Sequence, residues 1–153
     1  MKKISILGVL IGGIVDIIAT NILAFPFILY VMLTRIDFLS MPQDQITIAM
    51  TKIIQGDWLL FTIQFLLGSF CSIFGGYIAA LIAKHDELLN GALSAYLCVG
   101  IGIYSVSKGI GTESIFLVLL GFILSPALSL LGGYLRLLQK KSKQRKLESI
   151  ATT

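Results

Sequence analysis

Charged side chains are scarce in this chain. They make up 13% of its 153 residues, whereas soluble domains carry about a quarter. Hydrophobic residues make up 56%, and the mean hydropathy is +0.93. Four stretches, 4–33, 58–83, 88–107 and 114–135, contain a single charged residue between them, Asp16. This distribution excludes a soluble enzyme, a nucleic-acid-binding domain and a disordered chain.

Cysteine and histidine are also rare. The two cysteines, Cys71 and Cys98, lie in apolar stretches without Cys-x-x-Cys spacing, and the one histidine, His85, lies in a short loop. A disulfide scaffold is excluded, and buried thiols and a solvated histidine are favoured over a redox or metal site. Hydrolase, metalloprotease, P-loop and dinucleotide motifs are absent from the sequence. We therefore expect no enzyme activity, no catalytic residue, no cofactor and no bound metal.

The long apolar runs predict membrane helices. A nearly charge-free run of 18 or more apolar residues is typical of a membrane-spanning helix. The predicted fold is an all-α bundle of four transmembrane helices in one domain, residues 1–138, with spans at about 4–33, 58–83, 88–107 and 114–138. The first run is longer than the apolar part of a signal peptide, so we expect an uncleaved first span.

Two segments are predicted to depart from simple straight spans. Pro26 removes a backbone hydrogen bond inside the first span, which predicts a bend or break near residues 22–26. Residues 139–153 are expected to extend the last span and then fray into a disordered basic tail.

A fifth, amphipathic helix is predicted at about 42–55, between the first two spans. Its apolar residues recur at helical spacing: Ile46, Ala49, Met50, Ile53 and Ile54. It lies either on the outer surface of the bilayer or on top of the bundle, and the pattern fits both.

The basic residues predict an orientation. Four spans place nine Lys and Arg residues on the side of the two termini, against Arg35, Lys52 and Lys108 on the other side. Lys and Arg concentrate in cytoplasmic loops, so both termini are expected in the cytoplasm. The tail from Arg136 onward carries six basic residues and one acidic residue. It is expected to contact anionic lipid rather than nucleic acid.

The second and fourth spans contain similar segments. Residues 65–77 align with residues 122–134 at a constant offset, and Phe, Ser, Gly-Gly and Tyr match. A duplication would make the chain two helical hairpins of the same orientation, related by an axis along the membrane normal. These paired segments resemble those of small bacterial membrane proteins. The resemblance implies a location in the bacterial inner membrane and supplies no activity.

Small residues recur every fourth position along the spans. In membranes, helices associate through close contact at such residues. The predicted helix-packing residues are Gly8, Gly12, Gly68, Ser72, Gly76, Ser125, Ser129 and Gly133. These stripes face either the other helices of the chain or another protomer.

One polar group within the spans is a candidate site. Asp16 is the single ionisable residue there, Thr20 follows one turn later, and Asn21 lies partly on the same face. A carboxyl group in a membrane is costly unless it is neutral, paired or hydrated. Asp16 is either a protonated structural group bonded between helices or a proton or cation site, and the first interpretation is favoured.

Two functions follow from these features. The preferred hypothesis is a non-enzymatic structural or assembly component that packs through its small-residue interfaces, with itself or with a larger membrane partner. The alternative is a small proton- or cation-coupled transporter or channel that uses Asp16. Membrane lipids are expected partners in both cases.

Overall fold

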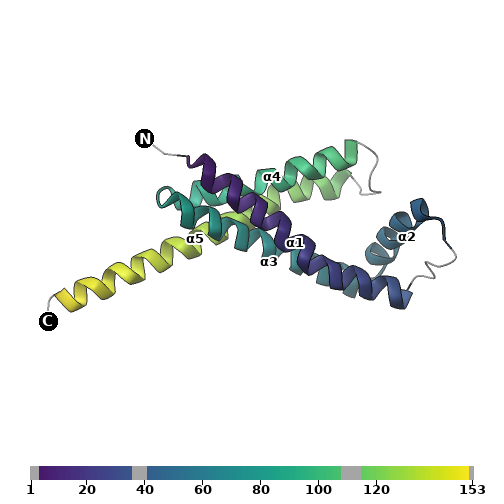
Figure 1. Ribbon diagram of the computed structural model, residues 1–153, viewed down its shortest axis with the longest axis horizontal. Helices are drawn as coiled ribbons and strands as arrows, with labels where there is room; N and C mark the ends of the chain where they lie inside the picture. The colour runs from purple at the N-terminus through teal and green to yellow at the C-terminus, as the bar shows by residue number, and fades with distance from the viewer. Residues whose placement is uncertain (1–3, 36–40, 108–114, 152–153) are drawn as a thin grey trace.

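A computed structural model describes residues 4–35, 41–107 and 115–151, and all regular structure in these ranges is helical. The helices in chain order are α1 (Ile6–Arg35), α2 (Gln43–Gly56), α3 (Trp58–Ala83), α4 (Glu87–Ser107) and α5 (Ile115–Ala151) (Figure 1). All except α2 are long and apolar enough to cross a membrane. The predicted all-α architecture with four long apolar helices is confirmed.

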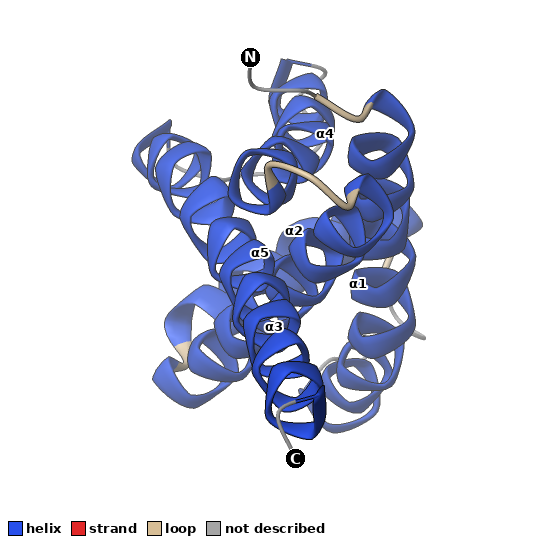
Figure 2. Cartoon of the chain, turned by 90° about the vertical axis from the view of Figure 1, so that its left-hand side faces the viewer, coloured by secondary structure: helices blue, strands red, loops and turns tan. Residues whose placement is uncertain are grey.

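Helix α3 is the central element of the bundle. It packs against α1, α4 and α5, and α1 and α4 also contact each other. Helices α4 and α5 form a second closely packed pair. In Figure 2 the described residues are all helix or loop. The fold therefore brings α1, α3 and α4 together around one line of contact, with α5 on the other side of α3 and α4.

Three chain segments meet at one end of the bundle. The backbone N–H of Ser5 donates to the side chain of Asn90 at 2.7 Å, near the start of α4. The Lys140 ammonium donates to the carbonyl of Lys84 at 3.2 Å, in the turn between α3 and α4. The start of α1, the α3–α4 turn and Lys140 of α5 are thus neighbours, on the left in Figure 1.

The ends of α3 have clear local causes. Asp57 is its N-cap, and its carboxylate accepts hydrogen bonds from the backbone N–H of Leu59 and Leu60 at 2.9 and 3.3 Å. The same carboxylate pairs with Arg35 at 3.5 Å, which ties the end of α1 to the start of α3. At the other end, Lys84 adopts a left-handed conformation with φ 59°, which terminates the helix.

Helix α2 packs on the bundle. It contacts α3 and α1 at the end opposite to the α3–α4 turn (Figure 1). The contact is a hydrophobic cluster of Val31, Ile54 and Leu60, with Phe27, Met50 and Ile53 against it. Of the two placements that the sequence left open, the structure shows this contact with the bundle.

Two sequence expectations are corrected in part. Of the predicted bend or break near residues 22–26, a break is excluded, because α1 runs as one 30-residue helix through Pro26. A proline removes one backbone hydrogen bond, and the bonds of the flanking turns persist. Helix α5 continues to Ala151, so the predicted disordered tail is helical to that residue. Its sequence after Gly133 lacks glycine and proline and is rich in Leu, Lys, Gln and Arg, which favour helix.

Candidate functional site

The contact between α1 and α3 is built on glycines. A Cβ atom on Gly8 would lie 2.9 Å from the carbonyl oxygen of Ala79, and one on Gly12 would lie 2.7 Å from that of Gly75. On the α3 side, a Cβ on Gly75 would lie 2.7 Å from the Cβ of Asp16. Real Cβ atoms do not approach this closely, so the two backbones come together only because these positions lack a side chain. This contact places Asp16 directly against α3.

Asp16 is the centre of a buried polar cluster. Its side chain is 3% exposed. Oδ2 accepts from the Cys98 thiol at 3.2 Å and from the Ser72 hydroxyl at 3.4 Å, and Oδ1 accepts from the Thr20 hydroxyl at 3.5 Å. The donors come from α4, α3 and α1, so one carboxyl group connects three helices.

The surroundings of Asp16 are uncharged. Among the described residues, the ion pairs are Arg35 with Asp57 and Lys140 with Glu87, and neither includes Asp16. The described residues also contain no cluster of three His, Cys, Asp or Glu side chains suited to a metal ion. The chemistry of the cluster is therefore hydrogen bonding by neutral donors to one carboxyl group.

The predicted polar trio is only partly assembled. Thr20 bonds Asp16, but its residue surface is exposed. Asn21 is exposed and its amide donates to the carbonyl of Ile17 within α1 at 2.8 Å. Two donors of the cluster, Ser72 and Cys98, were not assigned to it from the sequence. Ser72 is one of the predicted packing residues, and Cys98 follows Ser94 by four positions in an apolar span, and this spacing was the available signal.

A second buried polar cluster joins α4 to α5. The hydroxyls of Ser94 and Ser129 lie 3.0 Å apart, and each donates to the carbonyl of Gly91 at 2.7 Å. One turn earlier in α4, Asn90 is fully buried, and its amide donates to the carbonyls of His85 and Asp86. Asn90 was missed by the sequence analysis, although an amide within an apolar stretch was a visible signal.

The other predicted packing residues divide into two groups. Gly76 lies against Ser129 of α5, and a Cβ on Gly133 would lie 2.6 Å from the carbonyl oxygen of Glu87 in α4. Gly68 differs, because a Cβ there would meet nothing within 4 Å, and Ser125 is partly exposed. The predicted stripes are thus used in the half of the bundle near the α3–α4 turn and left open further from it.

The basic segment of α5 contacts the rest of the bundle where the segment begins. The Lys140 ammonium lies 2.6 Å from the Glu87 carboxylate, whose side chain is 7% exposed. The side-chain oxygen of Gln139 accepts from the hydroxyl of Tyr77 and from Arg136, each at 2.7 Å. These contacts hold α5 against the turn between α3 and α4.

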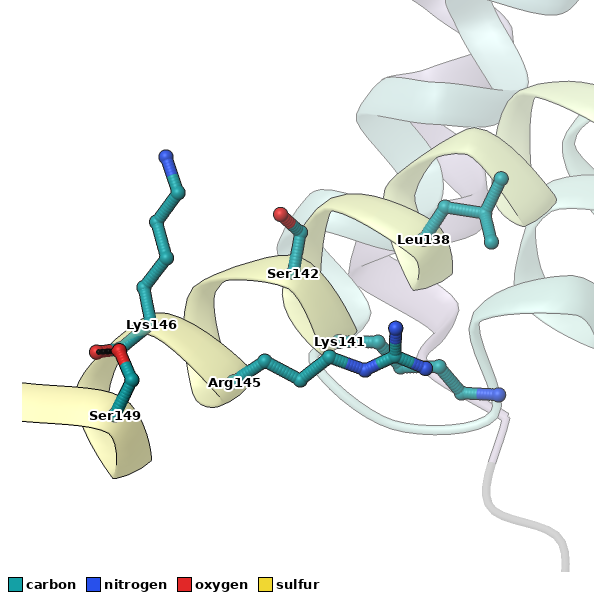
Figure 3. Close-up of a pocket in the computed structure, with 6 residues that line it drawn as sticks. All are labelled: Leu138, Lys141, Ser142, Arg145, Lys146 and Ser149. Atoms are coloured by element: carbon teal, nitrogen blue, oxygen red, sulfur yellow. Dashed lines mark hydrogen bonds between the residues drawn. The ribbon is translucent and has the colours of Figure 1, made fainter. Parts of the chain in front are cut away.

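Beyond these contacts, α5 has an open basic surface. Every residue from 141 to 149 is exposed. One side of this segment carries a surface hollow (Figure 3), lined by Leu138, Lys141, Ser142, Arg145, Lys146 and Ser149. The hollow gathers cationic and hydroxyl side chains, and it is separate from the Asp16 cluster.

Comparisons with protein-family models, with curated proteins and with solved structures found no match. The candidate sites therefore stand on the geometry described above.

Proposed function

We propose that this chain is a four-span protein of the bacterial inner membrane, with both termini in the cytoplasm. The four long apolar helices support insertion. The meeting of Ser5, Lys84 and Lys140 at one end is what four spans with both termini on one side require. The excess of Lys and Arg at this end supports a cytoplasmic location for it. The paired contacts of α1 with α3 and of α4 with α5 support two helical hairpins of the same orientation.

Within this membrane, the proposed role is that of a non-enzymatic structural or assembly component. The observation that carries this proposal is the Asp16 carboxyl, which three neutral donors from three helices surround. A carboxyl group held in this way stabilises an arrangement of helices. The glycine contacts around it serve the same end, because they allow close packing where lipid competes with side chains.

The partners proposed for this component are membrane lipids, with anionic lipid at the basic end of α5, and a second copy of the chain or a larger membrane protein. Crosslinking in native membranes followed by mass spectrometry of the intact assembly tests this proposal. We expect a complex that contains more than one protein chain. A chain that is monomeric and uncrosslinked at its native abundance contradicts the assembly role.

Substitution of Asp16 tests the structural interpretation. Asp16→Asn keeps an acceptor oxygen, and we expect stability within about 1 kcal/mol of the wild type. Asp16→Leu removes every acceptor and leaves buried donors unpaired, at a cost of about 2 to 3 kcal/mol. The measurement is thermal unfolding in detergent followed by circular dichroism. Asn21→Leu is the matched control on the same helix, because Asn21 is exposed and bonded only to its own helix.

One observation favours the second candidate, a proton- or cation-coupled transporter. Thr20 bonds Asp16 and is itself exposed, so a polar group connects the carboxyl to the molecular surface. In liposomes under a proton or sodium gradient, this function predicts a flux that Asp16→Asn abolishes. A flux that is absent in the wild type, or unchanged in Asp16→Asn, leaves the structural role.

A further inference from the structure

The last described turns of α5 extend beyond the bundle as an exposed basic segment, residues 141–149. Figure 1 shows α5 running past the ends of the other helices at the lower left. A helix rises about 1.5 Å per residue, so Lys141 lies about 10 Å beyond Tyr134 along the axis. With Tyr134 at the edge of the hydrocarbon, where aromatic rings concentrate, the segment begins beyond a headgroup layer of about 5 to 8 Å. The segment therefore extends into water rather than into lipid.

Two cations of this segment lack a counter-charge from the rest of the protein. Within the described residues, neither Lys141 nor Arg145 takes part in an ion pair, whereas the preceding Lys140 pairs with Glu87. Figure 3 shows the side chains of Lys141 and Arg145 extending in one direction from successive turns. Like charges one turn apart on a helix repel each other. Anionic groups of another molecule, placed opposite this pair, would therefore stabilise the segment.

The helix face that carries this pair has a defined order of side chains. Leu138, Lys141, Arg145 and Glu148 follow one another at spacings of three or four residues, and all four are exposed. At about 100° per residue they fall within an arc of about 80° around the helix. Along the axis, the face presents an apolar group, two positive groups and a negative group.

This order of side chains favours one kind of occupant. A nucleic acid presents a phosphate at every step, so Glu148 would be repelled and Leu138 would gain nothing. A second copy in the same membrane would project its own segment in the same direction, and Lys141 and Arg145 would face like charges. A protein segment can present carboxylates to the two cations, a cation to Glu148 and an apolar side chain to Leu138.

We infer that the face formed by Leu138, Lys141, Arg145 and Glu148 docks an acidic helical segment of another protein on the cytoplasmic side. In that segment, two carboxylates one helical turn apart lie opposite Lys141 and Arg145. The planar Arg145 guanidinium suits a carboxylate, because it can donate two parallel hydrogen bonds to it. This inference rests on the proposed membrane location and names the kind of partner that the basic end of α5 recognises.

The first test measures binding of a defined probe to the full chain in an uncharged detergent. The probe is a synthetic helical peptide with glutamate at every fourth position, and fluorescence anisotropy reports its binding. Arg145→Gln should weaken binding about tenfold, and Lys143→Gln only about twofold. Lys143 is the matched control, because it is exposed and lies about 200° around the helix from Lys141. Circular dichroism checks that both variants keep the helix content of the wild type.

The second test identifies the natural contact in native membranes. Photoreactive p-benzoylphenylalanine replaces either Ser142, which lines the surface hollow with Lys141 and Arg145, or Lys143 on the opposite side. Mass spectrometry then sequences the crosslinked peptide. We expect crosslinking from position 142, weak crosslinking from position 143, and a peptide with Asp or Glu residues three or four positions apart.

Several results overturn this inference. Equal losses in Arg145→Gln and Lys143→Gln mean that only the total charge of the segment matters. Equal binding of a peptide with glutamine in place of glutamate removes the need for carboxylates. Tighter binding of a duplex DNA oligonucleotide indicates a nucleic-acid surface. Crosslinks from position 142 only to lipid, only to a second copy, or to nothing contradict the proposed partner.

A separate measurement distinguishes this failure from failure of the proposed function. Resistance of the chain to alkaline extraction from membranes reports insertion and does not depend on Arg145. A chain that is extracted contradicts the membrane role itself. A chain that stays in the membrane but treats Arg145→Gln and Lys143→Gln alike loses only the docking face for an acidic partner.

Discussion

The two Gly-Gly-Tyr segments, residues 75–77 in α3 and 132–134 in α5, have the same sequence and different surroundings. In α3, Gly75 faces Gly12 and Asp16 of α1, and Gly76 faces Ser129 of α5. The α3 segment therefore packs against two different helices.

In α5, Gly132 faces Ile73 and Tyr77 of α3, and Gly133 faces Glu87 and Leu88 of α4. Each glycine pair thus joins its helix to two neighbours, but the neighbours differ because α3 is central and α5 is peripheral. The comparison teaches that a repeated packing motif specifies close approach and does not specify a partner.

The largest expected effect comes from filling a used glycine position. A Cβ on Gly76 collides with the backbone of Ser129, whereas a Cβ on Gly68, two turns away in α3, meets nothing within 4 Å. We expect Gly76→Ala to lower the free energy of unfolding by about 3 kcal/mol. Gly68→Ala should raise it by about 0.5 to 1 kcal/mol, because alanine favours helix more than glycine.

Thermal unfolding in detergent, followed by circular dichroism, measures both changes. The two substitutions add the same methyl group to the same helix, so their difference isolates the contact with α5. Equal effects of both substitutions contradict the packing of Gly76 against Ser129.

A smaller difference in unfolding free energy is expected between alanine substitutions of the two serines that precede these segments. Ser129 is fully buried, its hydroxyl donates to the carbonyl of Gly91 at 2.7 Å and it lies 3.0 Å from the hydroxyl of Ser94, whereas the Ser72 hydroxyl donates to Asp16 at 3.4 Å. Ser129→Ala should cost about 1 to 2 kcal/mol. Ser72→Ala should cost about 0.5 kcal/mol, because its bond is long and Asp16 keeps two other donors.

The same unfolding assay ranks these two serines. In addition, Ser72→Ala in an Asp16→Asn background tests their coupling, which should be small. If Ser72→Ala costs more than Ser129→Ala, the Asp16 cluster stabilises the bundle more than the contact between α4 and α5.

The features that were predictable from the sequence depend on local pattern. Nearly charge-free runs located all four long helices, and small residues at every fourth position located Gly12 and Gly76 at helix contacts. Asp16 follows Gly8 and Gly12 at the same spacing of four residues, so it lies on the face of α1 that contacts other helices.

What the sequence could not provide is the geometry between helices. Gly68 fits the same stripe as Gly76, but a Cβ on Gly68 would meet no other helix within 4 Å. The periodicity does not show which positions of a stripe another helix contacts. Cys98 joins Asp16 across 82 positions of sequence, so its role depends on how α1 and α4 pack. The charge of the last segment predicts disorder, but its helix propensity prevails as far as Ala151.

The smallest expected difference in stability is between phenylalanine substitutions of the two tyrosines that end these segments. The Tyr77 hydroxyl donates to Gln139 at 2.7 Å, just before the exposed basic segment of α5, whereas Tyr134 is exposed. Tyr77→Phe should cost about 0.5 kcal/mol, since an exposed hydrogen bond exchanges readily with water. Tyr134→Phe should leave stability unchanged within about 0.3 kcal/mol.

Hydrogen exchange of the α5 backbone near Gln139 is the more sensitive measurement, because it reports local opening of the contact between α5 and α3. We expect faster exchange in Tyr77→Phe than in Tyr134→Phe. Equal exchange rates in the two variants contradict a role for Tyr77 in holding α5 against α3.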